Sequence, residues 1–304
     1  MSAVLVDTGI DRGMPWHYGD PLGEQRRLED GTGVVDLSVR EVVRLTGSGR
    51  DKVLHLPGTL EKSDLERGET ASTYIFDTEG HIVLSLALVN GGDALWGWTE
   101  PGYGQVLVDR LNQTGLSIDV TPELCPDIAV VWVGHAVPDH EPGCGVRSGT
   151  PDCLGGSEVF VPRNEIDAVL GAGARAGSWA YTARRIAAGV PRFAVDFDSH
   201  TYPGELGVPY RRLAWDEERD REAPPRRLVR LHLDGSDEVF LEPGVPLVVP
   251  SSPHTPVGVA GSMAYHYEWG PIGLGLVQRE VADGSTLIAD GVAARVEALV
   301  GGGS

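Results

Sequence analysis

The sequence predicts a mixed α+β protein that ends in a small β-barrel. Residues 34–46, 72–90 and 128–134 read as strands, because apolar residues alternate with polar ones or form short runs between turn residues. Residues 101–112 and 164–174 have apolar residues at helical spacing. From Pro224 onward, short strands separated by turns predict a barrel of about 75 residues.

The elements before the barrel follow in order. STYIFD (72–77) and IVLSLALVN (82–90) flank a turn signal at 78–80, which predicts a β-hairpin. A helix is expected to begin at Pro101, because proline suits the first helical turn. Another helix is expected to end at Gly189, just before Pro191. Further strands are expected at 95–98, 118–120, 128–134, 158–163 and 193–195, with a long loop at 135–156.

The barrel strands are expected in five segments, and a charged linker precedes them. In the first segment, RRLVRLHLDG, the residues Val229, Leu231 and Leu233 share one face, while Arg230 and His232 share the other. The linker is expected at 211–222, where charged residues dominate. The remaining segments are VPLVV, PVGVAGS, PIGLGLVQ and STLIAD.

Composition excludes several classes of function. The formal net charge of −19 opposes binding to nucleic acids, which requires a basic surface, and to anionic membranes. No apolar run approaches the roughly 18 residues of a membrane span, and the N-terminus has no apolar core of a secretion signal. We therefore expect a cytoplasmic protein that acts on a small molecule, with no nucleic-acid or membrane partner. The oligomeric state does not follow from the sequence.

The cysteines do not predict a metal site. Cys125, Cys144 and Cys153 form no CxxC pair, and their odd number argues against a disulfide framework. His135, His140 and Cys144 are of the types that bind zinc, but their spacing matches no common zinc pattern. An irregular loop with incidental donors is the preferred interpretation, so no metal is predicted.

A cluster of acids is the strongest local candidate for a site. Asp196, Asp198, His200 and Glu205 fall within ten residues, and neighbouring acids shift each other's pKa. We predict Asp198, His200 and Glu205 as catalytic residues. The alternative is a polar loop with Asx-turns and salt bridges to arginines, because structural ion pairs also gather charges. Those arginines are Arg184, Arg185 and Arg192.

Several segments resemble one known family. HYGDPLGEQRRLEDGTGVVDLS (17–38) and VVRLTGSGR (42–50) resemble its opening strands. WAYTARRIAAGVPRFAVDFDSHTYPGE (179–205) is similar to its helix, its Gly-x-Pro-Arg turn and its Pro-x-Glu run. APPRRLVRLHLDG (223–235) and YHYEWGPIGLGLVQRE (265–280) resemble its barrel. The family is the YgfZ type of folate-binding protein, in the superfamily of the glycine cleavage T-protein, an aminomethyltransferase.

The resemblance implies a fold and a cofactor. The implied fold has two related α/β lobes and a C-terminal β-barrel around a central channel that holds tetrahydrofolate. The expected boundaries are 1–134 for the first lobe, 135–223 for the second lobe with its linker, and 224–300 for the barrel.

The resemblance also implies binding residues. Glu158 falls where the aminomethyltransferases recognise the pteridine ring, whose donor pair a carboxylate can accept bidentately. The alternative for Glu158 is a surface acid at the start of a strand. Arg185 is expected to bind the folate carboxylate or a nearby acid, and Trp179 to contact the cofactor or to pack in the core.

Two departures from the family pattern affect function. Leu84 and Ser85 stand where the aminomethyltransferases carry an Asp pair, and an aliphatic side chain cannot relay a proton. The Lys-Gly-Cys-Tyr-x-Gly-Gln-Glu motif of YgfZ proteins is absent between Glu205 and Pro224.

Three functions remain open. The first is a diverged, tetrahydrofolate-dependent transferase of one-carbon groups in a dedicated biosynthetic pathway. The second is an enzyme that uses the folate fold for a non-folate reaction. The third is a non-catalytic folate-binding accessory protein in iron–sulfur cluster maintenance, which the missing cysteine disfavours.

Overall fold

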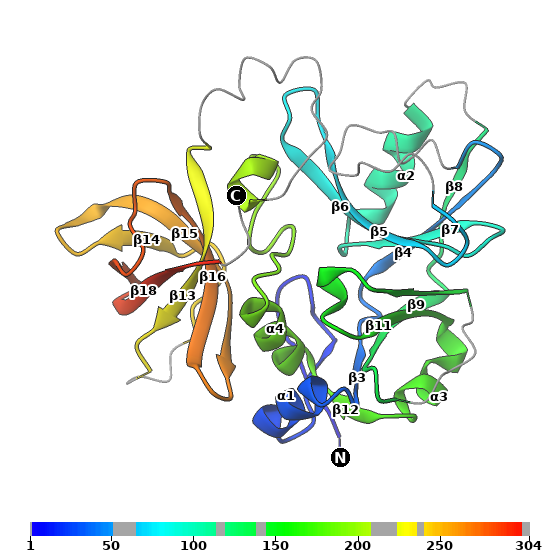
Figure 1. Ribbon diagram of the computed structural model, residues 1–304, viewed down its shortest axis with the longest axis horizontal. Helices are drawn as coiled ribbons and strands as arrows, with labels where there is room; N and C mark the ends of the chain where they lie inside the picture. The colour runs from blue at the N-terminus through cyan, green and yellow to red at the C-terminus, as the bar shows by residue number, and fades with distance from the viewer. Residues whose placement is uncertain are drawn as a thin grey trace. The chain divides into compact units, whose positions relative to one another are not determined.

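The structure is a computed structural model that describes residues 2–50, 65–113, 119–137, 144–207, 224–235 and 240–299 (Figure 1). The chain divides into two compact units. Unit 1 comprises Met1–Ile75 and Leu84–Tyr181, and unit 2 comprises Phe76–Val83 and Thr182–Ser304. The predicted linker at 211–222 lies outside the described residues. The predicted boundaries of the two lobes stay a prediction.

The first sheet of unit 1 carries Arg147 and Glu158 on neighbouring strands. Its strand order is β10-β11-β9-β3-β12, and only β12 runs parallel to its neighbour β3. The central strands are buried on both faces, as expected of strands that are covered on both sides. The bounds are β3 (Gly33–Asp36), β9 (Ile128–Val133), β10 (Gly145–Ser148), β11 (Ser157–Pro162) and β12 (Ala174–Ala176).

The second sheet has the order β5-β6-β7-β4-β8, so the predicted hairpin pairs within it. The tip of that hairpin, Phe76–Val83, belongs to unit 2. The strands of the second sheet are β4 (Glu41–Thr46), β5 (Thr70–Phe76), β6 (Ile82–Asn90), β7 (Leu95–Thr99) and β8 (Thr121–Leu124). A separate pair joins β1 (Val4–Leu5) to β2 (Pro15–His17).

In the part of the chain that the structure describes, the α-helices are α1 (Pro21–Glu29), α2 (Gly104–Gln113), α3 (Ile166–Leu170) and α4 (Ser178–Ala187). Short 3₁₀ turns lie at Pro151–Cys153, Arg163–Glu165 and Pro203–Leu206. Helix α1 begins at a cap in which Asp20 accepts a hydrogen bond from the Gly23 N–H. Within the described residues, no helix combines the length and the apolar character needed to cross a membrane.

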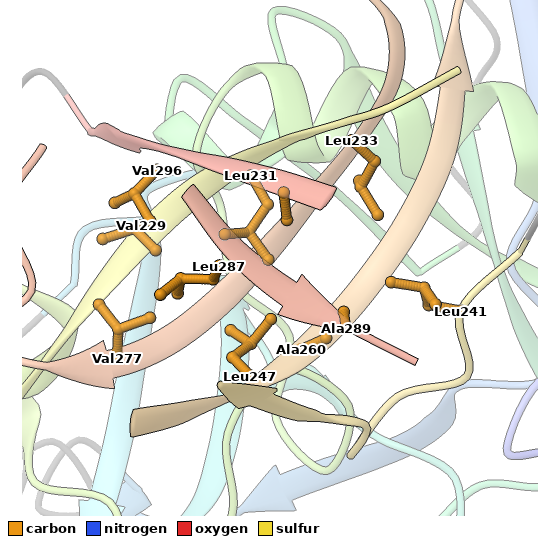
Figure 2. Packing of buried hydrophobic residues seen from close by; sticks show 11 residues of the cluster. Val229, Leu231, Leu233, Leu241, Leu247, Ala260, Val277, Leu287, Ala289 and Val296 are labelled. Carbon is orange, nitrogen blue, oxygen red and sulfur yellow. The ribbon is translucent and has the colours of Figure 1, made fainter. Parts of the chain in front are cut away.

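The C-terminal part of unit 2 is a closed barrel in the order β13-β16-β15-β14-β17-β18. The apolar side chains of Val229, Leu231 and Leu233 point inward, as the alternation predicts, and they meet Leu247, Leu287 and Val296 there (Figure 2). This confirms the predicted barrel. Its strands are β13 (Arg226–Leu233), β14 (Pro246–Val249), β15 (Ser252–His266), β16 (Gly270–Gln278), β17 (Thr286–Ala289) and β18 (Val292–Ala298).

Several predicted elements are wrong in type or extent. The loop predicted at 135–156 contains a strand, β10. The helix predicted to residue 174 ends at Leu170, because Gly171 and Gly173 interrupt it and β12 follows. Residues 193–195 form no strand, since Ala194 has a φ of 63° in the left-handed region. Helix α2 begins at Gly104, since Pro101 lies in a turn that precedes it.

Candidate ligand-binding site

The register of three neighbouring strands places Glu158 at the centre of a buried row. Glu158 on β11 lies opposite Arg147 on β10 and opposite Trp132 on β9, and directly paired residues share one face of a sheet. Glu158 and Arg147 are 0% exposed, and Trp132 is 1% exposed. The alternative of a surface acid at Glu158 is therefore wrong.

Both carboxylate oxygens of Glu158 accept hydrogen bonds from other parts of unit 1. The Arg40 guanidinium donates from Nη1 to Oε1 at 2.6 Å. Oε2 accepts from Trp98 Nε1 and from Arg147 Nη1, each at 2.7 Å. These three donors come from different strands and turns, and together they fix the orientation of the Glu158 carboxyl group.

Arg147 connects Glu158 to the 3₁₀ turn at Pro151–Cys153. Its Nη2 donates to Asp152 Oδ2 at 2.5 Å and to the Ser72 hydroxyl, and its Nη1 lies 3.3 Å from Cys153 Sγ. Burial opposes the charged form of Arg147, but Glu158 and Asp152 outweigh it and raise the pKa of the guanidinium. The arginine is therefore a permanent cation within the sheet.

Arg40 lies in the turn between β3 and β4. Asp36 shapes this turn, because its Oδ1 accepts from the Ser38 N–H at 2.8 Å, and the Arg40 N–H donates to the Leu37 carbonyl at 3.0 Å. The Arg40 guanidinium lies over the Trp98 ring, 3.6 Å from its centroid. The turn thus delivers a cation to the aromatic face beside Glu158.

Tyr181 on helix α4 also lies beside the Arg40 guanidinium. Its hydroxyl oxygen lies 3.4 Å from Arg40 Nη2, and its ring packs edge-on against Trp132 with the centroids 6.2 Å apart. Burial raises the pKa of Tyr181 to about 12, so the phenol stays protonated. Glu158, Trp98 and Tyr181 are hereafter called the cradle.

The predicted catalytic residues lie in unit 2. Asp198 and His200 are exposed, and Asp198 accepts hydrogen bonds from the His200 N–H at 3.0 Å and from the Thr201 hydroxyl at 3.2 Å. Glu205 is buried, and it accepts from Arg226 Nε at 2.7 Å and Nη2 at 2.9 Å. These contacts are those of a polar loop with an ion pair. A catalytic role for the three residues stays a prediction.

Arg185 also lies in unit 2 and binds a nearby acid. Its Nη1 donates to Asp196 Oδ2 at 2.7 Å and to the Val190 carbonyl at 2.6 Å, and its Nη2 bonds to Ser262. Asp196 in turn accepts from the Ser262 N–H at 2.6 Å. The side chain that was expected to bind folate or an acid therefore ties the segment after α4 to the barrel.

Trp179 belongs to unit 1, where its ring stacks on Trp16 with the centroids 4.9 Å apart. It is half-buried. Glu24 holds the adjacent backbone by accepting from the Gly177 N–H at 2.8 Å. Of the six predicted site residues, Glu158 and Trp179 lie in unit 1 and the other four lie in unit 2.

The sequence did not indicate Arg40, Trp98, Arg147 or Tyr181 as partners of Glu158. Arg40 is 118 residues away along the chain and Trp98 is 60 residues away. The available signal was the position of Arg40, two residues after the Asp-Leu-Ser segment that carried part of the family resemblance.

Leu84 and Ser85 occupy the hairpin positions at which the resemblance would place an Asp pair. Leu84 is fully buried. The Ser85 hydroxyl is buried and has no hydrogen-bond partner in the part of the chain that the structure describes. Within those same residues, no three His, Cys, Asp or Glu side chains are grouped as metal ligands, and His140 of the zinc alternative lies outside them.

Comparison with solved structures identifies the architecture. The chain is similar to the crystal structure of glycine cleavage system aminomethyltransferase T from Bartonella henselae, with a TM-score of 0.78 over 98% of this chain and 93% of that chain. The chain has an aminomethyltransferase-like fold. The two sequences are 16% identical, so the similarity establishes the fold alone. No family model and no curated protein matches the sequence.

The aminomethyltransferase-like fold confirms the predicted fold class, with its mixed α/β content and its closed C-terminal barrel. The closer resemblance to YgfZ proteins stays a prediction.

Proposed function

We propose that this chain binds tetrahydrofolate through the cradle and is a transferase of one-carbon groups. The observation that carries the proposal is the buried carboxylate of Glu158, which accepts a planar guanidinium lying 3.6 Å over the Trp98 ring. The aminomethyltransferase-like fold supports it.

The residues of the cradle suit the pterin end of tetrahydrofolate. The aminopyrimidinone ring of a pterin is a cyclic guanidine, flat and bearing adjacent N–H donors. Glu158 Oε1 is an acceptor for such a donor, and the indole face of Trp98 is a stacking surface for such a ring. Oε2 accepts from both Trp98 and Arg147, and among the described residues Oε1 accepts from Arg40 alone, so we propose that the ligand bonds to Oε1 in place of the expected bidentate contact.

In this proposal, Glu158, Trp98 and Arg147 of unit 1 each have a role. Glu158 orients the ligand by accepting its N–H, Trp98 packs against the ring, and Arg147 holds Glu158 in place through its hydrogen bond to Oε2. Bound tetrahydrofolate supplies the carrier of the one-carbon unit. A catalytic role for Asp198 and His200 of unit 2 stays a prediction, and the carboxylate of Glu205 is occupied by Arg226.

A non-folate reaction is the second candidate function. It is favoured by Leu84 and Ser85, which replace the expected acid pair with a buried aliphatic side chain and a hydroxyl. The accessory role in iron–sulfur cluster maintenance gains no support from the cysteines, since burial raises the pKa of Cys125 and Cys153 to about 11.

Calorimetric titration of the full chain with tetrahydrofolate and 5,10-methylenetetrahydrofolate tests the proposal. We expect micromolar affinity for the wild-type protein, and about 10- to 100-fold weaker binding for Glu158→Gln, on the scale of one charged hydrogen bond. Leu287→Ala in the barrel core controls for lost stability and should bind as the wild type does. Absence of heat from a folded wild-type protein would reject folate and leave the second candidate.

A further inference from the structure

We propose that Arg40 is an internal ligand of the cradle, which a planar guanidine-type molecule displaces when it binds. This inference rests on the proposed function, and it adds the class of ligand and a residue that controls its access. The proposal concerns the side chain of Arg40 only, and every residue that carries it belongs to unit 1.

The contacts of Arg40 are those that a guanidine-type ligand needs. Its Nη1 donates to Glu158 Oε1 at 2.6 Å, its Nη2 lies 3.4 Å from the Tyr181 hydroxyl, and its Cζ lies over the Trp98 ring, 3.6 Å from the centroid. A guanidinium and the aminopyrimidinone edge of a pterin share planarity, delocalisation and adjacent N–H donors. The cradle is therefore complementary to both, and only one of them fits at a time.

Arg40 is the arginine that can leave. Its side chain is 7% exposed, whereas that of Arg147 is fully enclosed. Arg147 is also bound to Asp152 and Ser72, so its departure would break these contacts in the interior as well as the pair with Glu158. Departure of Arg40 leaves Glu158 paired with Arg147 and Trp98, and no isolated charge remains buried.

The backbone that carries Arg40 is fixed independently of its guanidinium. Asp36 and the Leu37 carbonyl hold the turn, and Arg163 donates to the Ser38 carbonyl at 2.8 Å. A change of side-chain rotamer is therefore sufficient to open the cradle, which is the common scale of motion when a ligand binds.

While Arg40 occupies the cradle, a second ligand cannot bind there. The apparent Kd of that ligand is therefore its intrinsic Kd divided by the fraction of molecules in which Arg40 has left the cradle. Removing the Arg40 guanidinium should therefore tighten the binding of folate. Removing a residue that contacts the ligand would instead weaken that binding. The direction of the change separates an internal competitor from an ordinary binding residue.

The test compares wild type, Arg40→Ala and Arg44→Ala. Arg44 is a matched control, because it too lies near an indole ring, 5.7 Å from the Trp96 centroid, but it is partly exposed and paired with the exposed Glu123. In calorimetry with tetrahydrofolate we expect Arg40→Ala to bind tenfold tighter or more, and Arg44→Ala to bind as the wild type does. Methylguanidinium at millimolar concentration should raise the Tm of Arg40→Ala and not that of the wild type. In the double variant with Arg40→Ala and Glu158→Gln, methylguanidinium should no longer raise the Tm.

The outcomes separate the two proposals. Equal or weaker folate binding by Arg40→Ala, with wild type binding, overturns the internal-ligand proposal and keeps folate. If methylguanidinium raises the Tm of Arg40→Ala but folate binds neither to this variant nor to the wild type, the proposed function is overturned. The proposal that the cradle binds guanidine-type molecules then stands. Absence of both effects in a folded Arg40→Ala protein overturns the internal ligand. If Arg40→Ala does not fold, Arg40→Lys replaces it in the folate titration, because lysine keeps the charge without the planar edge; binding no tighter than wild type then overturns the proposal.

Discussion

Arg147 and Glu158 lie directly opposite each other on β10 and β11, and their side chains form an ion pair of 2.7 Å that solvent does not reach. The pair belongs to a chain of charges that runs from Asp152 through Arg147 and Glu158 to Arg40. Two carboxylates and two guanidiniums alternate in this chain, so each charge has a partner of opposite sign.

Replacing Glu158 should strongly destabilise the protein. Glu158→Gln leaves Arg40 and Arg147 without their shared carboxylate, and removing one partner of a buried ion pair costs about 3 to 5 kcal/mol. Chemical denaturation measures this free energy of unfolding. Glu123→Gln is the control, because its pair with Arg44 is exposed and such pairs contribute about 1 kcal/mol or less. Equal losses in the two variants would contradict the account.

Asp152 should make the stability depend on acid pH. Burial alone would raise the pKa of this carboxyl, but the Arg147 charge and hydrogen bonds from Thr150 and Ser72 outweigh it and lower the pKa. Because the folded value lies below the unfolded value of about 3.9, the contribution is complete above that pH and is lost as pH falls through the folded value.

Unfolding of wild type and Asp152→Asn should therefore be compared from pH 7 to pH 3. We expect wild type to be the more stable at pH 7 and the difference to shrink below about pH 4. A difference that stays constant across this range would show that Asp152 contributes no charge to the network.

Two of the cysteines should resist alkylation in the folded protein. Burial raises the pKa of Cys125 and Cys153 to about 11, and only the thiolate is a good nucleophile. Mass spectrometry after iodoacetamide at pH 8 should find both unmodified, with complete modification after denaturation. Rapid native labelling of Cys153 would place it in a different environment.

Glu205 and His200 should separate structural from catalytic roles. Glu205→Gln weakens the pair with Arg226 and should lower stability by about 1.5 to 3 kcal/mol, the range for a hydrogen bond to a charged group. His200→Ala changes an exposed side chain and should leave the Tm unchanged, while turnover falls about a hundredfold if the imidazole transfers a proton. Unaltered turnover in His200→Ala would reject that catalytic assignment.

The sequence predicted the barrel well, because its information is local. Alternation in β13 is enough to place Val229, Leu231 and Leu233 inside. The loop at 135–156 concealed β10, because glycine and proline around a short strand weaken its pattern. Arg147 was missed with that strand.

The site was less predictable than the fold, since its contacts are long-range. Glu158 was found through a family resemblance, but its partners Arg40 and Trp98 come from distant parts of the chain. Nothing in EVFVPR indicates that the acid is enclosed by two arginines, because that depends on the register of β10 and β11 and on the turn before β4.

A crystal structure of the full chain grown with tetrahydrofolate tests the central claim most directly. The account predicts the pterin ring on the face of Trp98, its amino edge at Glu158 Oε1, the Arg40 guanidinium displaced, and the Arg147–Glu158 pair retained. A folate bound elsewhere while Arg40 stays on Glu158, or crystals without folate at saturating concentration, would contradict it.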